Sequence, residues 1–362
     1  MRREMRIDYW CIPVFLVMSV VQPTFAQSIN SIGVNSKGHI FICPWERGVL
    51  RSTDDGVHWR TSNANIADSS YGSFIVSINR TDNILAAGGY GSVYRSTNNG
   101  DSWTKLNITT NGTYCVGSNG KEHIFLGTST GIFRSTDDGL SWTKLSQGLV
   151  YDPAIVSLLI QDSSTILAGC FTIGPQGTEF RIARSSDNGD NWQTVDSTHA
   201  VYSFCSMSGD TILAGTYGSG ILCSGDRGAN WSSFDNTATY FASILATPRY
   251  VFAGSRSGGG ISRCLHTSDS MHTVNSGLLN TTIYCLAVTS DGDVLAGSGD
   301  GLFRSSNSGY SWSTIPLLTS VRRDVAVSPG PFRFEKSYPN PFNPSTVLRF
   351  YTAMRGHVIL AI

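Results

Sequence analysis

An eight-residue pattern, Ser-x-Asp/Asn-x-Gly-x-x-Trp, recurs along this chain and constrains its fold more than any other feature. Six copies end at Trp59, Trp103, Trp142, Trp192, Trp231 and Trp312. A worn seventh copy lies between the last two, with His266 in place of the acid, Ser268 in place of the glycine and Met271 in place of the tryptophan. Successive spacings are 44, 39, 50, 39, 40 and 41 residues. We call this pattern the box. A repeat of about 40–45 residues indicates a β-propeller.

Each repeat contains the same four short apolar segments. In residues 281–321 these are TIYCLAVT, GDVLAGS, GLFRSS and, after the Asn307–Gly309 turn, SWSTI. Four antiparallel strands per repeat form one propeller blade, and a blade buries both of its faces only against its neighbours. The sequence therefore predicts an all-β fold, with a seven-bladed β-propeller of four-stranded antiparallel blades over residues 27–321.

The box residues are of the types that a tight turn between the third and fourth strands requires. An Asp or Asn at the third position can accept backbone N–H bonds, and glycine at the fifth can adopt a positive φ. The tryptophan can pack between blades, with about 2–3 kcal/mol of burial. The second acid is replaced in four copies, which argues against a catalytic pair. We therefore predict structural roles for the box acids and amides, which are Asp54, Asn98, Asp137, Asp187, Asp226 and Asn307.

The box resembles the Asp-box, or BNR repeat, of sialidases, sortilin-type receptors, xyloglucan-cleaving endoglucanases and photosystem assembly factors. That resemblance implies a propeller over about four-fifths of the chain. It implies no single activity, because the families that share the repeat do unrelated things.

The N-terminus has the pattern of a secretory signal peptide over residues 1–26. Arginines precede an apolar stretch from Trp10 to Val21, and Thr24–Ala26 provide small residues for cleavage. The apolar stretch is shorter than the roughly 20 residues of a membrane span, so we expect no transmembrane segment in the mature chain. Seven cysteines would remain, and neither their number nor their spacing imposes a disulfide framework.

The C-terminus has the features of a sorting domain. After a linker at residues 322–333, YPNPFNPST resembles the start of the type A sorting domain of proteins exported by the bacterial type IX secretion system. The resemblance implies a small β-sandwich with a first strand at TVLRF, and the secretion machinery as a partner. Residues 334–362 are short for such a domain, which predicts a truncated sandwich with unpaired edges. We expect an extracellular or cell-surface protein, or a periplasmic one if the tail fails.

Sequence patterns for enzyme chemistry are missing. The chain has no H-E-x-x-H motif, zinc spacing, P-loop or G-x-S-x-G elbow, so we predict no metal site and no cofactor. The Arg-Ile-Pro motif of the resembled sialidases does not occur, and a single propeller cannot form the two-propeller cleft of the endoglucanases. A net charge of zero gives no electrostatic footprint for nucleic acid. A glycosidase and an assembly factor remain as alternatives to a binding module.

A ligand site is expected on the face opposite the boxes, where loops between second and third strands meet the blade-to-blade connections. Aromatic and arginine side chains there suit a protein or a carbohydrate ligand. Blade 4 carries the longest insertion, CFTIGPQGTEF, which we interpret as a loop. The candidate binding residues are Trp45, Arg47, Tyr90, Phe171, Glu179, Tyr217, Arg256 and Asp300. We therefore predict a non-catalytic binding module.

Overall fold

The computed structural model describes most of residues 28–317 and three short strands outside them. The described ranges are 17–18, 28–45, 47–66, 74–78, 82–88, 91–108, 110–119, 123–174, 177–267, 270–317, 332–338 and 346–352. They belong to two compact units, one within residues 26–317 and one made of the two ends of the chain. Each unit is described by itself.

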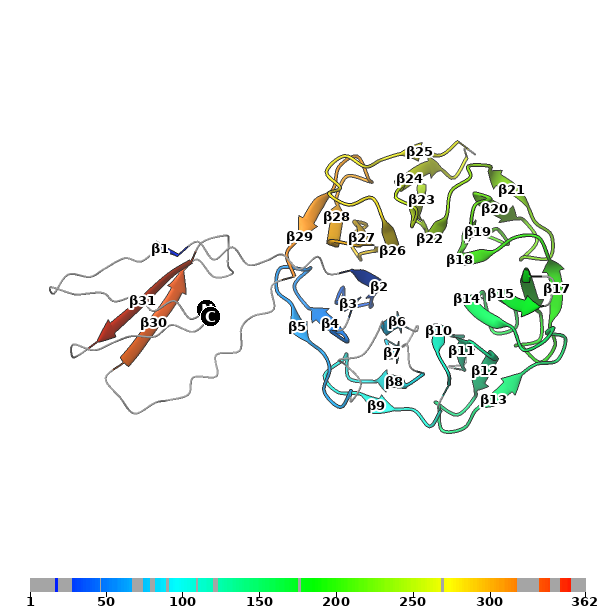
Figure 1. Ribbon diagram of the computed structural model, residues 1–362, viewed down its shortest axis with the longest axis horizontal. Coiled ribbons are helices and arrows are strands. Elements are labelled where there is room, and N and C mark those ends of the chain that lie inside the picture. The colour runs from blue at the N-terminus through cyan, green and yellow to red at the C-terminus, as the bar shows by residue number, and fades with distance from the viewer. Residues whose placement is uncertain are drawn as a thin grey trace. The chain divides into compact units, whose positions relative to one another are not determined.

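The first unit is a ring of seven four-stranded antiparallel sheets, as predicted (Figure 1). The innermost strands are β2 (Ile29–Val34), β6 (Phe74–Ile78), β10 (Thr113–Ser118), β14 (Ala154–Ile160), β18 (Val201–Ser206), β22 (Phe241–Ala246) and β26 (Ile283–Val288). The second strands are β3 (Ile40–Pro44), β7 (Ile84–Gly88), β11 (Ile124–Thr128), β15 (Ile166–Gly174), β19 (Ile212–Thr216), β23 (Tyr250–Ser255) and β27 (Val294–Ser298).

The two outer positions of each blade carry shorter strands. The third strands are β4 (Leu50–Ser52), β8 (Val93–Ser96), β12 (Gly131–Ser135), β16 (Gly177–Ser185), β20 (Ile221–Ser224), β24 (Gly260–Leu265) and β28 (Gly301–Ser305). The outermost strands are β5 (Arg60–Thr61), β9 (Thr104–Lys105), β13 (Thr143–Leu145), β17 (Gln193–Asp196), β21 (Ser232–Asp235), β25 (His272–Thr273) and β29 (Ser313–Ile315). All four strands predicted for blade 7 are confirmed.

Each blade is one continuous piece of chain, so side-chain packing closes the ring. Innermost strands contact those of both neighbours, and β26 of the last blade contacts β2 of the first. At this closing boundary Trp59 shares an apolar cluster with Leu295 and Leu302. Arg304 also pairs with Asp55, at 2.5 Å between Nη2 and Oδ2. The last boundary is therefore built like those between consecutive blades.

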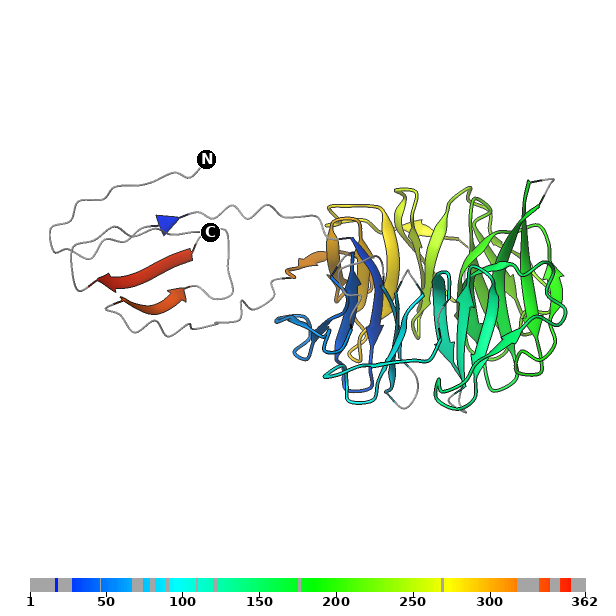
Figure 2. The same cartoon turned by 60° about the horizontal axis from the view of Figure 1, so that its bottom comes forward.

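The core is the set of layers between adjacent blades. Second strands lie in the middle of these layers, and all five residues of β3, β7, β11, β19 and β27 are buried. Their alternating side chains contact two different neighbours, which explains why these segments are apolar without a polar face. The innermost and outermost strands are more polar because each has one side toward solvent (Figure 2).

The antiparallel order gives the ring two faces. The box face carries the turns between third and fourth strands and between first and second strands. The loop face carries the connections between second and third strands and between blades. The insertion of blade 4 extends a hairpin and is largely not a loop as we expected, since β15 and β16 pair Phe171 with Phe180 and Thr172 with Glu179. β-Branched and aromatic residues at alternate positions favour this extension.

The second unit is a three-stranded sheet of β1 (Val17–Met18), β31 (Thr346–Thr352) and β30 (Phe332–Tyr338). β30 and β31 form an antiparallel pair, with Phe334 opposite Phe350. The predicted strand TVLRF lies within β31. Most of the predicted signal peptide and linker falls outside the described residues. Within the part of the chain that the structure covers, there is no helix with the length and hydrophobicity to cross a bilayer.

Candidate functional site

The box forms a closed hydrogen-bonded turn, which blade 4 illustrates. The Ser185 hydroxyl donates to Asp187 (2.7 Å) and accepts from the backbone N–H of Gly189 (2.8 Å). Asp187 accepts from the backbone and side chain of Asn191, and the Trp192 indole donates to the Gly189 carbonyl (2.9 Å). A Cβ on Gly189 would lie 2.7 Å from Leu145 of blade 3 and require a φ of +91°. The turn is thus shaped by its own bonds and by the preceding blade.

The residue before the box glycine joins each blade to the one before it. This residue has a positive φ in all six intact boxes, at Asp55, Asn99, Asp138, Asn188, Arg227 and Ser308. At five blade boundaries its backbone carbonyl accepts a hydrogen bond from an arginine of the preceding blade's third strand, namely Arg51, Arg134, Arg184, Arg263 and Arg304. Arg95 instead pairs with the Asp138 carboxylate, 2.6 Å away. In the sequence the arginine recurs directly before the box serine, at Arg51, Arg95, Arg134, Arg184 and Arg304, but the pattern does not indicate its partner in the next blade.

The box tryptophans lie against the preceding blade. Trp192, for example, shares an apolar cluster with Phe125 and Ile132 of blade 3. Two of the indoles donate directly across the boundary, from Trp103 to the Ser62 carbonyl and from Trp312 to the Val274 carbonyl. Trp142 and Trp231 are only half-buried, so the tryptophans are not equally enclosed. These contacts are structural, and they use the indole rings and N–H groups of the box tryptophans.

The boundary between blades 5 and 6 departs from this plan. Cys223 stands where the third-strand arginine lies in other blades, and Cys264 stands in the box serine position. Met271 packs with Leu213 and Ile221 of blade 5, the set equivalent to that around Trp192. Ser268 lies outside the described residues. Within the described chain the Ser203 hydroxyl is buried without a hydrogen-bond partner, although the equivalent Ser31 and Ser157 bond to the next blade.

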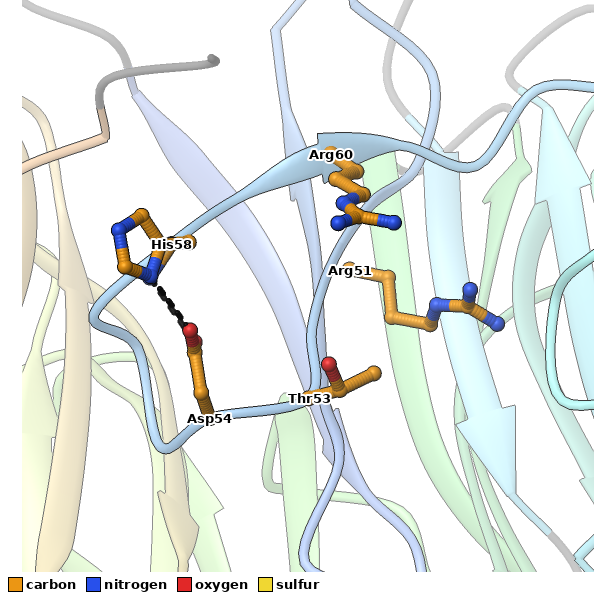
Figure 3. A pocket seen from close by; sticks show the side chains of 5 residues that line it. All are labelled: Arg51, Thr53, Asp54, His58 and Arg60. Atoms are coloured by element: carbon orange, nitrogen blue, oxygen red, sulfur yellow. Dashed lines mark hydrogen bonds and ion pairs between the residues drawn. The ribbon is translucent and has the colours of Figure 1, made fainter.

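A small pocket of about 90 Å³ on the box face of blade 1 is lined by Arg51, Thr53, Asp54, His58 and Arg60 (Figure 3). Asp54 and His58 bond to each other at 2.6 Å, and Arg51 pairs with Asp101 of blade 2. Partial burial pushes the pKa of Asp54 up, but hydrogen bonds from His58 and Ser52 outweigh it and leave that pKa lowered. These groups complete the turn, and the pocket offers no free acid for catalysis.

The loop face carries a cluster of tyrosines over blades 5, 6 and 7. Tyr202 is the second residue of the innermost strand of blade 5, Tyr217 follows the second strand of that blade, and Tyr240 directly precedes the innermost strand of blade 6. Ring centroids are 4.9 Å apart for Tyr202 and Tyr240, 5.0 Å for Tyr217 and Tyr240, and 6.3 Å for Tyr202 and Tyr217. Edge-to-face packing at these distances is favourable for aromatic rings.

Arg256, after the second strand of blade 6, completes this cluster. Its guanidinium lies 5.1 Å from the ring centroid of Tyr284 in blade 7, and its backbone N–H donates to the Tyr240 carbonyl (2.9 Å). Burial raises the pKa of the Tyr240 hydroxyl, and a hydrogen bond from Arg256 opposes that rise. Burial also raises the pKa of Tyr202. The phenols of Tyr202 and Tyr240 therefore remain neutral at neutral pH. We call Tyr202, Tyr217, Tyr240, Arg256 and Tyr284 the tyrosine platform.

The structure brings only some of the predicted binding residues together. Tyr217 and Arg256 meet through Tyr240, while Phe171 and Glu179 lie in the blade 4 hairpin, where Glu179 pairs with Arg181. Other predicted residues are exposed on blades 1 and 7, namely Trp45, Arg47 and Asp300. Tyr90, and Glu46 beside Trp45, lie outside the described residues.

Three members of the platform, Tyr202, Tyr240 and Tyr284, were not predicted. Tyr202 and Tyr284 are the second residues of innermost strands, in VYSF and TIYCL, and Tyr240 directly precedes one, in TYFAS. Tyr202 and Tyr284 occupy the same position of their repeats, which is a signal that could have been found. It was missed because tyrosine at a strand start is also ordinary β-sheet composition.

The described residues show neither a metal cluster nor a disulfide. No group of three or more His, Cys, Asp or Glu side chains in the described chain could hold a metal ion. No disulfide joins the seven described cysteines, and burial raises the pKa of each thiol for which a shift is resolved, as at Cys205, where it reaches about 11. Cys285 donates to the Ile29 carbonyl across the closing boundary. These thiols pack between blades.

Comparison with known proteins places the fold but not a family. No protein-family model and no curated protein matches the sequence. Among solved structures, the extracellular domain of BT4673 from B. thetaiotaomicron superimposes with a TM-score of 0.65 at 13% identity, over 81% of this chain and 39% of that one. The GH74 xyloglucanase from Xanthomonas campestris gives 0.65 at 13%, over 84% and 56%.

YCF48 from Cyanidioschyzon merolae gives a TM-score of 0.57 at 16% identity, over 80% of this chain and 97% of that one. YCF48 bound to D1 peptide gives 0.59 at 15%, over 83% and 96%. This chain thus spans about two fifths of the BT4673 domain, about half of the xyloglucanase and nearly all of YCF48. At such identities the likeness concerns the propeller fold.

Proposed function

We propose that this protein is an exported or cell-surface binding module without catalytic activity, and that its ligand binds on the tyrosine platform. The observation that carries the proposal is the convergence of four tyrosines and one arginine from three blades on the loop face. Tyrosine and arginine are enriched where binding energy is concentrated, since they combine a large apolar area with hydrogen-bond donors. None of the five is a carboxylate, which favours recognition over hydrolysis.

Export is the part of this proposal that rests on the ends of the chain. Residues 1–26 have the pattern of a signal peptide, and residues 334–362 resemble the start of a type IX sorting domain. The box repeats resemble Asp-box propellers, a group that includes extracellular proteins. Cell fractionation of the producing bacterium, with a variant lacking residues 334–362, tests this part. A protein that stays in the cytoplasm contradicts it.

A glycosidase is the second candidate, favoured by the similarity of the propeller to the GH74 xyloglucanase. Glycoside hydrolysis needs two carboxyl groups about 5–9.5 Å apart. The predicted loop-face acids Glu179 and Asp300 belong to blades 4 and 7, and Glu179 is paired with Arg181. An assembly factor is the third candidate, favoured by the coverage of YCF48. Peptide binding would also fit this third role.

Binding and hydrolysis can be separated with one set of variants. The full chain is applied to glycan and peptide arrays and assayed against β-glucans and sialosides, beside Tyr217→Ala and Arg60→Gln, an exposed arginine of the box face. We expect a ligand whose binding falls about tenfold or more in Tyr217→Ala and is unchanged in Arg60→Gln. Turnover that disappears in Glu179→Gln or Asp300→Asn would overturn the proposal in favour of a glycosidase.

A further inference from the structure

Five arginines of the box face pair with aspartates, namely Arg51, Arg95, Arg134, Arg227 and Arg304. Two others, Arg184 and Arg263, donate to a backbone carbonyl of the next blade. In the described chain Arg256, on the loop face, is not engaged in either way. Within the described residues Arg256 forms no ion pair, and its side chain is exposed beside two phenol rings. A guanidinium held against aromatic rings keeps several N–H donors for a planar anion such as a carboxylate.

The rings beside Arg256 offer one accessible stacking surface. Tyr217 is 61% exposed, whereas Tyr202 and Tyr240 are half-buried beneath and beside it. The two supporting rings restrict the motion of Tyr217, so little conformational entropy is lost when a ligand stacks on it. Burial raises the pKa of the Tyr202 and Tyr240 hydroxyls, which therefore remain neutral hydrogen-bonding groups at physiological pH.

The backbone around the platform is already hydrogen-bonded. The N–H groups of Tyr217, Gly218 and Arg256 donate to the carbonyls of Ala200, Thr239 and Tyr240. A peptide that binds as an added strand needs free backbone donors and acceptors, and these three donors are occupied. Recognition must therefore come from ring faces, phenol hydroxyls and the guanidinium. A sugar ring satisfies all three when it carries a carboxylate.

We propose that the tyrosine platform binds an acidic oligosaccharide built of uronate residues, an assignment that rests on the binding role proposed above. One sugar ring stacks on Tyr217, its hydroxyls bond to the phenols of the platform, and its carboxylate pairs with Arg256. The site spans the boundary between blades 5 and 6 and continues to blade 7 through Tyr284.

The test compares tetragalacturonate with its fully methyl-esterified form, by isothermal titration calorimetry on the full chain. Methyl esterification removes the negative charge of each carboxylate, adds one methyl group there and leaves the sugar rings and hydroxyls unchanged. We expect the acid to bind at least about tenfold more tightly than the ester. Arg256→Gln should weaken binding of the acid by about tenfold and leave the ester unchanged, because only the acid uses the guanidinium. Tyr217→Ala should weaken the binding of both probes, because both stack a sugar ring on Tyr217.

Arg60→Gln is the matched control, since it removes one exposed guanidinium from the box face without touching the platform. Equal affinity for acid and ester, or equal losses in Arg60→Gln and Arg256→Gln, overturns the inference. Hexaglutamate that binds as tightly as tetragalacturonate also overturns it, because the site would then read charge and not sugar. If neither uronate probe binds but Tyr217→Ala abolishes an array ligand, the inference fails while the proposed binding role stands. If the natural chain binds no ligand on either array, both the inference and the proposed binding role are contradicted.

Discussion

Two blade boundaries follow the same plan with different completeness. Between blades 3 and 4, Trp192 fills the apolar slot, Arg134 donates to the Asn188 carbonyl (2.7 Å), and Cys115 donates to Ile155 of the next blade. Between blades 5 and 6, Met271 fills the slot, Cys223 replaces the arginine, and the buried Ser203 hydroxyl has no partner in the described chain. Three links are weakened at the same place.

The comparison teaches that the links are coupled across the boundary. At five other boundaries the arginine donates to the carbonyl of the positive-φ residue before the box glycine. An arginine at position 223 would need such a carbonyl in blade 6, where the box is worn. The boundary instead contains the sulfur-bearing side chains of Cys205, Cys223, Cys264 and Met271. The backbone N–H of Ala246 donates to the Cys205 sulfur (3.2 Å). Polarizable, adaptable side chains can fill such a slot without the directional bonds of the box. On the loop face, the tyrosine platform crosses the same boundary.

The largest expected effect is on the tryptophan slot. Trp192→Ala should lower the free energy of unfolding by about 3–5 kcal/mol, because it empties a fully enclosed site. Met271→Ala should cost less than half as much, since Met271 is half-buried and smaller. Urea unfolding followed by circular dichroism measures both. Equal losses would show that the two boundaries are equally important for stability and would contradict the comparison.

Restoring the box of blade 6 should have the next largest effect. The triple variant His266→Asp, Ser268→Gly and Met271→Trp supplies the acid, the glycine and the indole ring. Adding Cys264→Ser supplies the box serine, whose hydroxyl in blade 4 bonds to the box acid and to the backbone N–H of the box glycine. We expect the free energy of unfolding of the quadruple variant to be about 1–2 kcal/mol above that of the natural chain and also above that of the triple variant. Thermal unfolding gives the order of the three proteins.

The walls of the Met271 position differ in one residue from those of the preceding boundary. Met271 shares an apolar cluster with Leu213, Ile221 and Phe234, whereas Trp231 shares one with Leu167, Ile182 and Val195. Because Phe234 is larger than Val195, a tryptophan at position 271 has less room, and overpacking reduces the expected gain. A quadruple variant less stable than the natural chain would mean that Phe234 fills the tryptophan position or that Met271 does not occupy it.

The arginine link should have a smaller effect. Arg134→Met keeps the alkyl stem but leaves the Asn188 carbonyl without its charged donor, and should cost about 1–2 kcal/mol. Cys223→Arg should be nearly neutral in the natural chain and should gain about 1 kcal/mol once the blade 6 box is restored. A double-mutant cycle measures that coupling. A gain from Cys223→Arg alone would show that the arginine acts without the box.

The fold could be predicted because the box repeats in sequence at a regular period. Trp59 and its five equivalents mark the blades without any knowledge of their neighbours. The arginine link could not be predicted, since Arg134 and Asn188 meet only after two blades have packed. The platform was half predicted. Tyr217 and Arg256 stand out in glycine-rich connections, whereas Tyr202 and Tyr284 look like ordinary strand residues until the ring brings their blades together.

The smallest expected effect concerns the box acids, which are exposed. Hydrogen bonds from Ser141 and Ser135 lower the pKa of Asp137 to about 2, from an ordinary 3.8. Since the folded pKa lies below the unfolded one, the stabilisation is complete above about pH 3.8 and is lost as the pH falls through 2. The urea concentration at which half of the protein is unfolded should therefore decrease as the pH is lowered from about 3.8 to 2. Exposure to solvent keeps the effect small.

Asp137→Asn is the matched control, because the same position holds asparagine in blades 2 and 7. There Asn98 and Asn307 accept the backbone N–H and donate their amide to Ser102 and Ser311, so the turn forms without a charge. The variant should therefore lose less stability than the natural chain between about pH 3.8 and 2, while the two match at neutral pH. Parallel acid profiles would mean that Asp137 is protonated equally in the folded and unfolded states, and the box acids would then differ from the box amides in charge alone.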